Sequence, residues 1–198
     1  MKLGLFGGSF DPPHLGHVKL VTAAAARCGL DRAVIIPAAC SPFKTNTRCG
    51  DADRMEMCRL SFPPMCEISD YEIARGGVSY TIETVLHFRA RNPGAELFLI
   101  VGEDQLLLFP KWYRWKEILH NAGLIAAVRS SSENRALLER FADQNLRAWG
   151  SVTVLEFTPI PISSTMLRRA LAENGPTEGM LTPETADYIR EKGLYRDV

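Results

Sequence analysis

Short apolar runs alternate with amphipathic segments along most of the chain. The runs are nearly continuous, which is typical of strands in a parallel sheet that is covered by helices on both faces. Glu96–Val101 is the clearest of them and Met65–Ser69 is the weakest. The segments expected to form strands are Lys2–Phe6, Arg32–Pro37, Met65–Ser69, Glu96–Val101, Leu124–Val128 and Val152–Phe157.

Helical periodicity fills the stretches between these runs. After the first strand, Val18, Val21, Ala25 and Cys28 recur at helical spacing, and Gly29 follows as a stop signal. Start and stop signals mark the C-terminal pair of helices. Asn174-Gly175-Pro176 ends the first of them, and Thr182-Pro183 begins the second. The other expected helices are Ala52–Leu60 capped by Asp51, Tyr80–Ala90, Glu103–Asn121 broken at Pro110, Glu133–Ala148, one ending at Asn174-Gly175-Pro176, and one from Thr182-Pro183 to Gly193.

This alternation predicts an α/β fold: a Rossmann-like, doubly wound parallel sheet with C-terminal helices. The sequence has no internal repeat, low-complexity tract or interdomain linker, so residues 1–198 are expected to form a single domain. In such folds, ligands bind outside the carboxyl ends of the strands, where the strand order reverses. The functional residues are therefore expected in the segments that follow strands.

Composition narrows the classes of partner. The 23 Lys and Arg residues balance 23 Asp and Glu, so the chain lacks the basic excess of a nucleic-acid or membrane-surface protein, and any anion must bind at a local site. The sequence shows no signal peptide and no apolar run of about 18 residues. Its five cysteines contain no C-x-x-C pair, match no zinc module and fit reduced thiols. We therefore expect a cytoplasmic protein with no membrane or nucleic-acid partner and no metal cluster of its own.

A phosphate site is predicted directly after the first strand, where residues 7–17 read G-G-S-F-D-P-P-H-L-G-H. Gly7 and Gly8 let backbone N–H groups approach a ligand, and the helix start adds further donors and the positive end of its dipole. His14 and His17 lie three residues apart, so both imidazoles can face one anion. The spacing fits neither a Walker loop nor a dinucleotide fingerprint. A zinc pair and two incidental histidines are the remaining alternatives.

A second candidate segment, Ile160–Arg168, follows the last predicted strand and opens a helix. Hydroxyl residues at a helix start can be simple caps, which would explain Ser163 or Ser164 alone. Arg168 lies four residues beyond Ser164, on the same helical face, where its guanidinium fork suits a polyphosphate. The combination favours phosphate binding over capping alone.

These two segments resemble the signatures of the nucleotidyltransferases related to class I aminoacyl-tRNA synthetases. The first matches G-x-F-x-P-x-H-x-G-H and the second matches I-S-S-T-x-x-R. The intervening Ser79-Tyr80-Thr81, Gly102-Glu103-Asp104 and Lys111-Trp112-Tyr113 resemble the bacterial nicotinate mononucleotide adenylyltransferases in particular. The likeness extends to Gly193-Leu194-Tyr195-Arg196 and so covers nearly the whole chain.

The resemblance implies transfer of the adenylyl group of ATP to nicotinate mononucleotide, with Mg²⁺ carried on ATP. His14, His17 and Arg168 would be the catalytic groups. By the same resemblance the other ATP-binding residues would be Gly7, Gly8, Ser9, Phe10, Gly102, Asp104, Ile162, Ser163 and Ser164. The pyridine nucleotide would be held by Lys44, Thr81, Thr84, Trp112 and Tyr113.

Ordinary structural roles stay open for several of these residues. Trp112 can be a core aromatic, Asp104 can be a first-turn carboxylate, and Thr81 and Thr84 can cap a helix. The chain also departs from the family in reading Ser41-Pro42-Phe43-Lys44 where Pro-His-Lys or Pro-His-Arg is usual. Phe43 cannot donate to a phosphate, whereas the adjacent lysine keeps a cation there.

Two alternatives remain, a related enzyme with another acceptor and a protein of another class. A related enzyme would use nicotinamide mononucleotide, phosphopantetheine or glycerol phosphate as its acceptor. The aromatic Trp112-Tyr113 pair argues against these acceptors, because an aromatic platform suits a pyridine ring better than a pantetheine arm. A catalytically weak nucleotide-binding regulator is suggested only by Phe43. The sequence leaves the oligomeric state open, a homo-oligomer included.

Overall fold

The structure is a computed structural model that describes residues 1–40, 47–129 and 132–196. Its sheet has six strands in the order β3-β2-β1-β4-β5-β6, and the β1–β4, β4–β5 and β5–β6 pairs are parallel. That order is the one typical of a doubly wound Rossmann sheet, with the reversal between β1 and β4. The predicted fold class is therefore confirmed. The strands are β1 (Lys2–Gly8), β2 (Arg32–Pro37), β3 (Cys66–Ile68), β4 (Glu96–Gly102), β5 (Gly123–Arg129) and β6 (Val152–Phe157).

The apolar runs form strands because both faces of the sheet are buried. In β2 every residue after Arg32 is buried, and in β4 the five residues Leu97–Val101 are buried. Residues on neighbouring strands lie in register, with Leu5 of β1 beside Leu99 of β4. The carboxyl ends of β1 and β4 thus lie at the same edge of the sheet.

Helices connect the strands at the predicted places, with several corrections to their ends. The described residues form α1 (Leu15–Cys28), α2 (Asp51–Ser61), α3 (Tyr71–Arg75), α4 (Thr81–Arg91), α5 (Glu103–Leu108), the 3-10 turn η1 (Phe109–Lys111), α6 (Trp115–Asn121), α7 (Ser132–Asn145), α8 (Ser164–Ala172) and α9 (Pro183–Lys192). Within those residues, no helix is long and apolar enough to cross a membrane.

Two details of the helices were not predicted correctly. Gly50, not Asp51, is the N-cap of α2, because the Asp51 side chain pairs with Arg54 inside the first turn. The five-residue α3 was missed, since so short a segment shows no periodicity. At the other end of the chain, the predicted caps of α9 are confirmed: Thr182 Oγ1 accepts from the Thr185 N–H, and Gly193 ends the helix with φ +63°.

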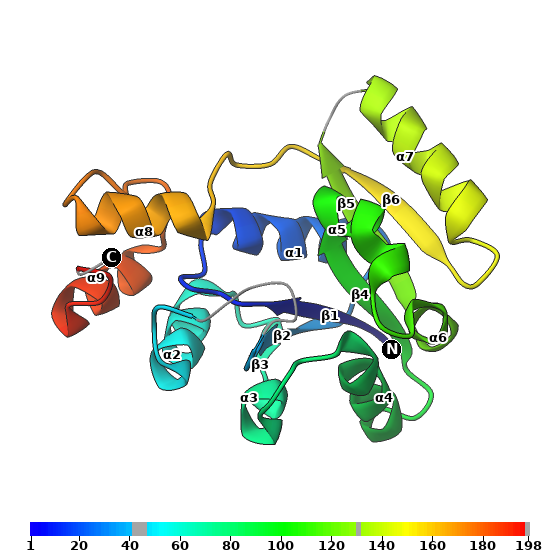
Figure 1. The fold of residues 1–198 in the computed structure, drawn as a ribbon, viewed down its shortest axis with the longest axis horizontal. Coiled ribbons are helices and arrows are strands. Elements are labelled where there is room, and N and C mark those ends of the chain that lie inside the picture. The colour runs from blue at the N-terminus through cyan, green and yellow to red at the C-terminus, as the bar shows by residue number, and fades with distance from the viewer. Residues whose placement is uncertain (41–46, 130–131, 197–198) are drawn as a thin grey trace. The chain divides into compact units, whose positions relative to one another are not determined.

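The chain divides into two compact units, each made of three segments. Unit 1 contains Met1–Gly7, Leu20–Val34 and Tyr80–Pro159, and unit 2 contains Gly8–Lys19, Ile35–Ser79 and Ile160–Val198. In unit 1, α7 packs on β5 and β6, α5 packs on β4 and β5, and α4 packs against α6 (Figure 1). In unit 2, α2 packs against α9.

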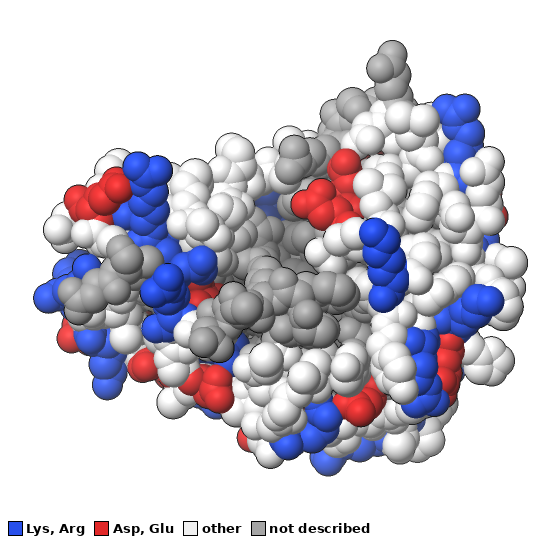
Figure 2. All heavy atoms as spheres, in the orientation of Figure 1, with Lys and Arg blue, Asp and Glu red and all other residues white. Residues whose placement is uncertain are grey.

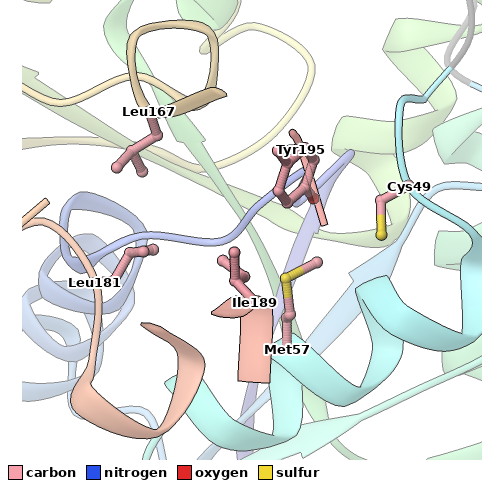
Figure 3. Packing of buried hydrophobic residues seen from close by; sticks show 6 residues of the cluster. All are labelled: Cys49, Met57, Leu167, Leu181, Ile189 and Tyr195. Atoms are coloured by element: carbon pink, nitrogen blue, oxygen red, sulfur yellow. The ribbon is translucent and has the colours of Figure 1, made fainter. Parts of the chain in front are cut away.

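Unit 2 has an apolar cluster of its own, formed largely by its helices. Figure 3 shows how its side chains gather between α2, α8, α9 and the segment after α9. Two segments of unit 2, Ile35–Ser79 and Ile160–Val198, contribute to it, so the C-terminal helices are integral to this unit. The buried members are Cys49, Met57, Leu167, Leu181, Ile189 and Tyr195.

Candidate functional site

The turn after β1 is shaped by Phe10, whose ring folds back over Gly8. A Cβ on Gly8 would lie 3.0 Å from Phe10 Cζ, so a larger residue there would displace the ring. Phe10 is buried, has φ +46°, and meets the His17 ring edge-on at 5.2 Å between centroids. The second glycine of the motif therefore makes room for an aromatic side chain that supports a histidine.

His14 and His17 are brought together as predicted, but by a capping arrangement. His14 precedes α1, and its carbonyl accepts from the His17 and Val18 N–H groups. The His14 N–H in turn donates to His17 Nδ1 at 3.2 Å, so the side chain three residues into the helix start accepts from the residue before it, as in one half of a capping box. The two rings stack with centroids 3.7 Å apart and planes 25° apart.

This contact fixes the tautomer of His17. A ring nitrogen that accepts from a backbone N–H cannot carry a proton, so the proton of neutral His17 must be on Nε2. His17 is thereby prepared as a donor through Nε2, and its orientation is set by the backbone of its own helix start.

His14 is deeply buried, with 7% of its surface exposed. Burial disfavours the charged ring and lowers the pKa of His14 from 6.5 to about 4. Its Nδ1 is buried and has no hydrogen-bond partner among the described residues. A Cβ on Gly16 would lie 2.9 Å from this nitrogen, which explains the glycine between the two histidines.

The start of α8 is attached to the same turn. Ser163 is the N-cap of α8, and its Oγ accepts from the Met166 N–H at 3.1 Å. Ser164 donates from Oγ to the carbonyl of Pro12 at 2.9 Å. The two hydroxyls thus do different things: one caps the helix, and the other ties it to the segment that leads into His14.

The guanidinium of Arg168 is bonded to a backbone carbonyl of the turn and to a hydroxyl, rather than to a carboxylate. Its Nη1 donates to the carbonyl of Asp11 at 2.6 Å, and its Nη2 donates to Thr165 Oγ1 at 3.2 Å. Its side chain is 21% exposed, so part of the guanidinium can be reached from solvent.

Other arginines of these helices are neutralised locally. Arg169 pairs with Glu173 at 2.8 Å, and Arg190 pairs with Asp187 at 2.7 Å. Figure 2 shows the resulting mixture of basic and acidic side chains over α8 and α9. Arg168 differs from these two in that its nearest oxygen is a backbone carbonyl.

Arg54 is a site residue that sequence reasoning missed. It is fully buried, and it donates from Nη1 to the carbonyl of Ser9 and from Nη2 to the carbonyl of Ala38, both at 2.7 Å. It therefore ties the glycine turn to the segment after β2. The available signal was an arginine on the same helical stripe as the buried Met57 and Cys58.

In unit 1, Gly7 and Gly102 stand at the carboxyl ends of the neighbouring strands β1 and β4. Gly102 is the N-cap of α5, and Asp104 is an exposed residue in the first turn of that helix. This is the switch point of the sheet, where a doubly wound fold binds its ligands. Asp104 also fits the first-turn carboxylate that the sequence left as its alternative.

The residues predicted to hold the pyridine nucleotide also lie in unit 1, around α4 and η1. Thr81 begins α4 and is partly exposed, while Thr84 is buried. Trp112 follows η1 with its ring 5.1 Å from Phe109, and it is partly buried. Tyr113 is 59% exposed, and its ring lies 4.9 Å from that of Tyr80, the residue before Thr81. The ring contact connects the two predicted substrate-binding segments.

The predicted residues thus form two groups. One, in unit 2, contains Ser9, Phe10, His14, His17, Ile162, Ser163, Ser164 and Arg168 with Gly8; the other, in unit 1, contains Gly7, Thr81, Thr84, Gly102, Asp104, Trp112 and Tyr113. Lys44 lies outside the described residues, as does Phe43. Within the described part of the chain, no group of three or more His, Cys, Asp or Glu residues could hold a metal ion.

Comparison with known proteins identifies the family. The model of the cytidylyltransferase-like family matches residues 5–170, a range that includes both motif segments. A probable nicotinate-nucleotide adenylyltransferase of Bordetella avium is 38% identical over 198 residues, covering 98% of each chain. One of Chloroherpeton thalassium is 34% identical over 202 residues, covering 99% of this chain and 98% of the relative. The chain belongs to the nicotinate-nucleotide adenylyltransferase family.

Solved structures share the fold of this adenylyltransferase family member. The nicotinic acid mononucleotide adenylyltransferase of Plasmodium falciparum, complexed with NaAD, superposes with a TM-score of 0.76 at 17% identity and covers 98% of this chain and 97% of its own. A putative nicotinate-nucleotide adenylyltransferase from Vibrio parahaemolyticus gives a TM-score of 0.69 at 21% identity, covering 100% and 98%. The family resemblance inferred from the two motifs is confirmed.

Proposed function

We propose that this chain transfers the adenylyl group of ATP to nicotinate mononucleotide, which gives deamido-NAD and pyrophosphate. The observation that carries the proposal is the arrangement in unit 2: two stacked imidazoles at a helix start, with a partly exposed arginine held on the turn that leads into them. A helix N-terminus with imidazole and guanidinium donors is a phosphate site. Family membership supports the reaction type.

The reaction needs no nucleophilic side chain. The acceptor phosphate is already an anion, and one of its oxygens attacks the α-phosphorus of ATP in line while pyrophosphate leaves. Catalysis then consists of holding the reactants and stabilising the charge that develops on the phosphoryl oxygens.

Three residues of unit 2 supply that stabilisation. His17, protonated on Nε2, donates to the oxygens of the transferring α-phosphoryl group. His14 and Arg168 act on the β and γ groups, where the guanidinium offers N–H groups beyond the two already bonded to Asp11 and Thr165. These donors are fixed before the substrate arrives, so little reorganisation accompanies the reaction.

Mg²⁺ enters this site on ATP. The phosphate-facing side chains of unit 2 are imidazole and guanidinium donors rather than the carboxylates that magnesium prefers, so they fit a metal held by the phosphates themselves. When bound, the ion neutralises phosphate charge.

The pyridine nucleotide is assigned to the group in unit 1. Trp112 would stack on the pyridine ring, and Thr81, Thr84 and the backbone at Tyr113 would hold its polar groups, with Lys44 on phosphate. Backbone donors aimed at a carboxylate would be poorly used by a neutral amide, so the acid should be preferred over the amide by at least about 10-fold. Gly102 and Asp104 would contact the adenosine.

The test is pyrophosphate release from purified protein with Mg·ATP and each acceptor in turn: nicotinate mononucleotide, nicotinamide mononucleotide, phosphopantetheine and glycerol phosphate. We expect turnover with nicotinate mononucleotide, and deamido-NAD as the product by mass spectrometry. Equal rates with the acid and the amide would contradict the assigned specificity. Tight binding of ATP without turnover of any acceptor would instead support a nucleotide-binding regulator.

A further inference from the structure

Asp11 is a buried carboxylate on which three segments of unit 2 meet. Only 4% of the residue is exposed. The phenol of Tyr195 donates to Oδ1 at 2.8 Å, and the backbone N–H of Arg48 donates to Oδ2 at 2.7 Å. Arg168 donates to the backbone carbonyl of the same residue at 2.6 Å. Each carboxylate oxygen thus has a close donor of its own.

The carboxylate of Asp11 does not form the fork-to-fork pair that arginine and aspartate commonly make. Arg168 Nη1 lies 3.9 Å from Oδ2, beyond hydrogen-bond distance, although it is bonded to the carbonyl of the same residue. A bidentate pair with Asp11 would engage the N–H groups that a phosphate needs. The position of this carboxylate therefore decides how much of Arg168 is available to a ligand.

We propose that Tyr195 is a positioning residue, which holds the Asp11 carboxylate beyond hydrogen-bond distance of Arg168 so that the guanidinium stays available to the polyphosphate of ATP. The proposal rests on the assignment of ATP to unit 2. Without the phenol, Oδ1 would be a buried acceptor that has lost its donor. Arg168, whose Nη1 is already 3.9 Å from Oδ2, is a cation that could satisfy it. The carboxylate would then compete directly with the substrate.

Tyr195 is suited to this task because its environment leaves the ring little freedom. The residue is 6% exposed, has φ +64°, and packs in the cluster with Cys49, Met57 and Ile189 (Figure 3). Burial, together with the negative charge of Asp11, raises the pKa of the phenol far above its usual range. The hydroxyl therefore remains a donor at any pH at which the protein works.

The chain offers a matched control in Tyr188. Its phenol donates to Asp53 Oδ1 at 2.8 Å, and its ring packs against the same apolar cluster. Tyr195→Phe and Tyr188→Phe therefore delete the same group, a phenol hydroxyl. Both tyrosines lie near the C-terminal end of unit 2, and each donates to an aspartate. Only the first change touches the carboxylate beside Arg168.

The experiment measures the dissociation constant of Mg·ATP by calorimetry, and KM for each substrate where turnover is seen. We expect Tyr195→Phe to weaken ATP binding about five- to ten-fold, the effect of one misplaced charged hydrogen bond, and to leave KM for nicotinate mononucleotide unchanged. Tyr188→Phe should bind ATP as the wild type does. The dissociation constant is measured without turnover. A protein without activity would therefore contradict the proposed function, whereas the role of Tyr195 in ATP binding could still be tested.

A double mutant separates positioning from a general structural role. If Tyr195 acts through the charge of Asp11, Tyr195→Phe should change the ATP dissociation constant less than about two-fold in an Asp11→Asn background, because the competing charge is gone. An undiminished effect in that background would overturn the proposal. Unchanged ATP affinity in the Tyr195→Phe single variant, or an equal loss in Tyr188→Phe, would overturn it as well.

Discussion

At the residue scale, His17 is the side chain on which the proposed chemistry depends most. Its contacts include the His14 N–H on Nδ1, the stacked His14 ring and the ring of Phe10. We expect His17→Ala to lower kcat by about 100-fold or more, the size seen when one preorganised donor is lost, with little change in melting temperature. Steady-state kinetics and a thermal melt measure both.

His120→Ala is the control for this change, because His120 is an exposed histidine in α6 of unit 1. It should keep the activity and melting temperature of the wild type. A His17→Ala protein that is active but unfolds easily would show that His17 is structural.

Burial of His14 makes the stability of the protein depend on pH. The folded ring has a pKa of about 4, while the unfolded ring binds a proton near pH 6.5. The unfolded state therefore takes up more protons as the pH falls, and the contribution of His14 is present above pH 6.5 and is lost between about pH 6.5 and pH 4. The loss amounts to about 3 kcal/mol at most, at 1.36 kcal/mol per unit.

Urea unfolding at a series of pH values between 7 and about 4 tests this expectation. The free energy of unfolding of His14→Gln should fall less steeply than that of the wild type, and His120→Gln should follow the wild type. Parallel curves for His14→Gln and the wild type would contradict the burial argument. The comparison between variants matters because carboxylates also titrate in this range.

The sequence could predict that His14 and His17 share a site but not how. Spacing alone indicates that two side chains face one way. The burial of His14, the support of His17 by Phe10 and the partners of Asp11 depend on residues that are distant in sequence, such as Tyr195. Arg54 was missed for the same reason, since its acceptors are carbonyls of two separate loops.

At the scale of elements, apolar runs predicted the strands better than periodicity predicted the helix ends. β2 matches the prediction at both ends, because its buried residues 33–37 form one continuous run between less buried neighbours. Helix ends depend on local hydrogen bonds. In α2 the Asp51 side chain pairs with Arg54 instead of capping, and in α8 Ser163 does cap. A list of favourable cap residues does not distinguish these two cases.

The cap of α8 gives a prediction about the stability of the fold. Ser163→Ala removes the acceptor for the Met166 N–H and should lower the free energy of unfolding by about 1 kcal/mol. Ser163→Asn keeps a capping acceptor and should restore most of it. Chemical denaturation of the three proteins measures the difference. If both variants are equally unstable, the hydroxyl of Ser163 stabilises the fold in some other way than capping.

At the scale of the whole molecule, the fold class and the family followed from the sequence, whereas the division into two units did not. The chain passes between the units five times, and β1, β2 and α1 each begin in one unit and continue in the other. Such interleaving leaves no linker for composition to mark. The single domain inferred from the absence of a linker stays a prediction. It can be tested by asking whether the two units unfold together.

We expect the two units to unfold in one cooperative transition. The reason is that β1, β2 and α1 each belong partly to both units, so unfolding of one unit breaks elements of the other. The chain provides a probe for each unit. All three tryptophans lie in Tyr80–Pro159 of unit 1, so intrinsic fluorescence reports on that unit. Cys58 is fully buried in α2 of unit 2, and its pKa is raised well above the usual range by burial, so it should react with a thiol reagent only after unfolding.

Urea titrations that follow tryptophan fluorescence and pulse alkylation of Cys58, quantified by peptide mass spectrometry, should give the same midpoint and the same slope. Cys40 is the internal control, because it is exposed and should be alkylated at every urea concentration. Saturating Mg·ATP should move both transitions to higher urea together, since a ligand that binds only the folded state stabilises everything that unfolds with its site. If Cys58 becomes reactive at lower urea than the change in fluorescence, or if ATP shifts only the Cys58 transition, the two units are separate folding domains.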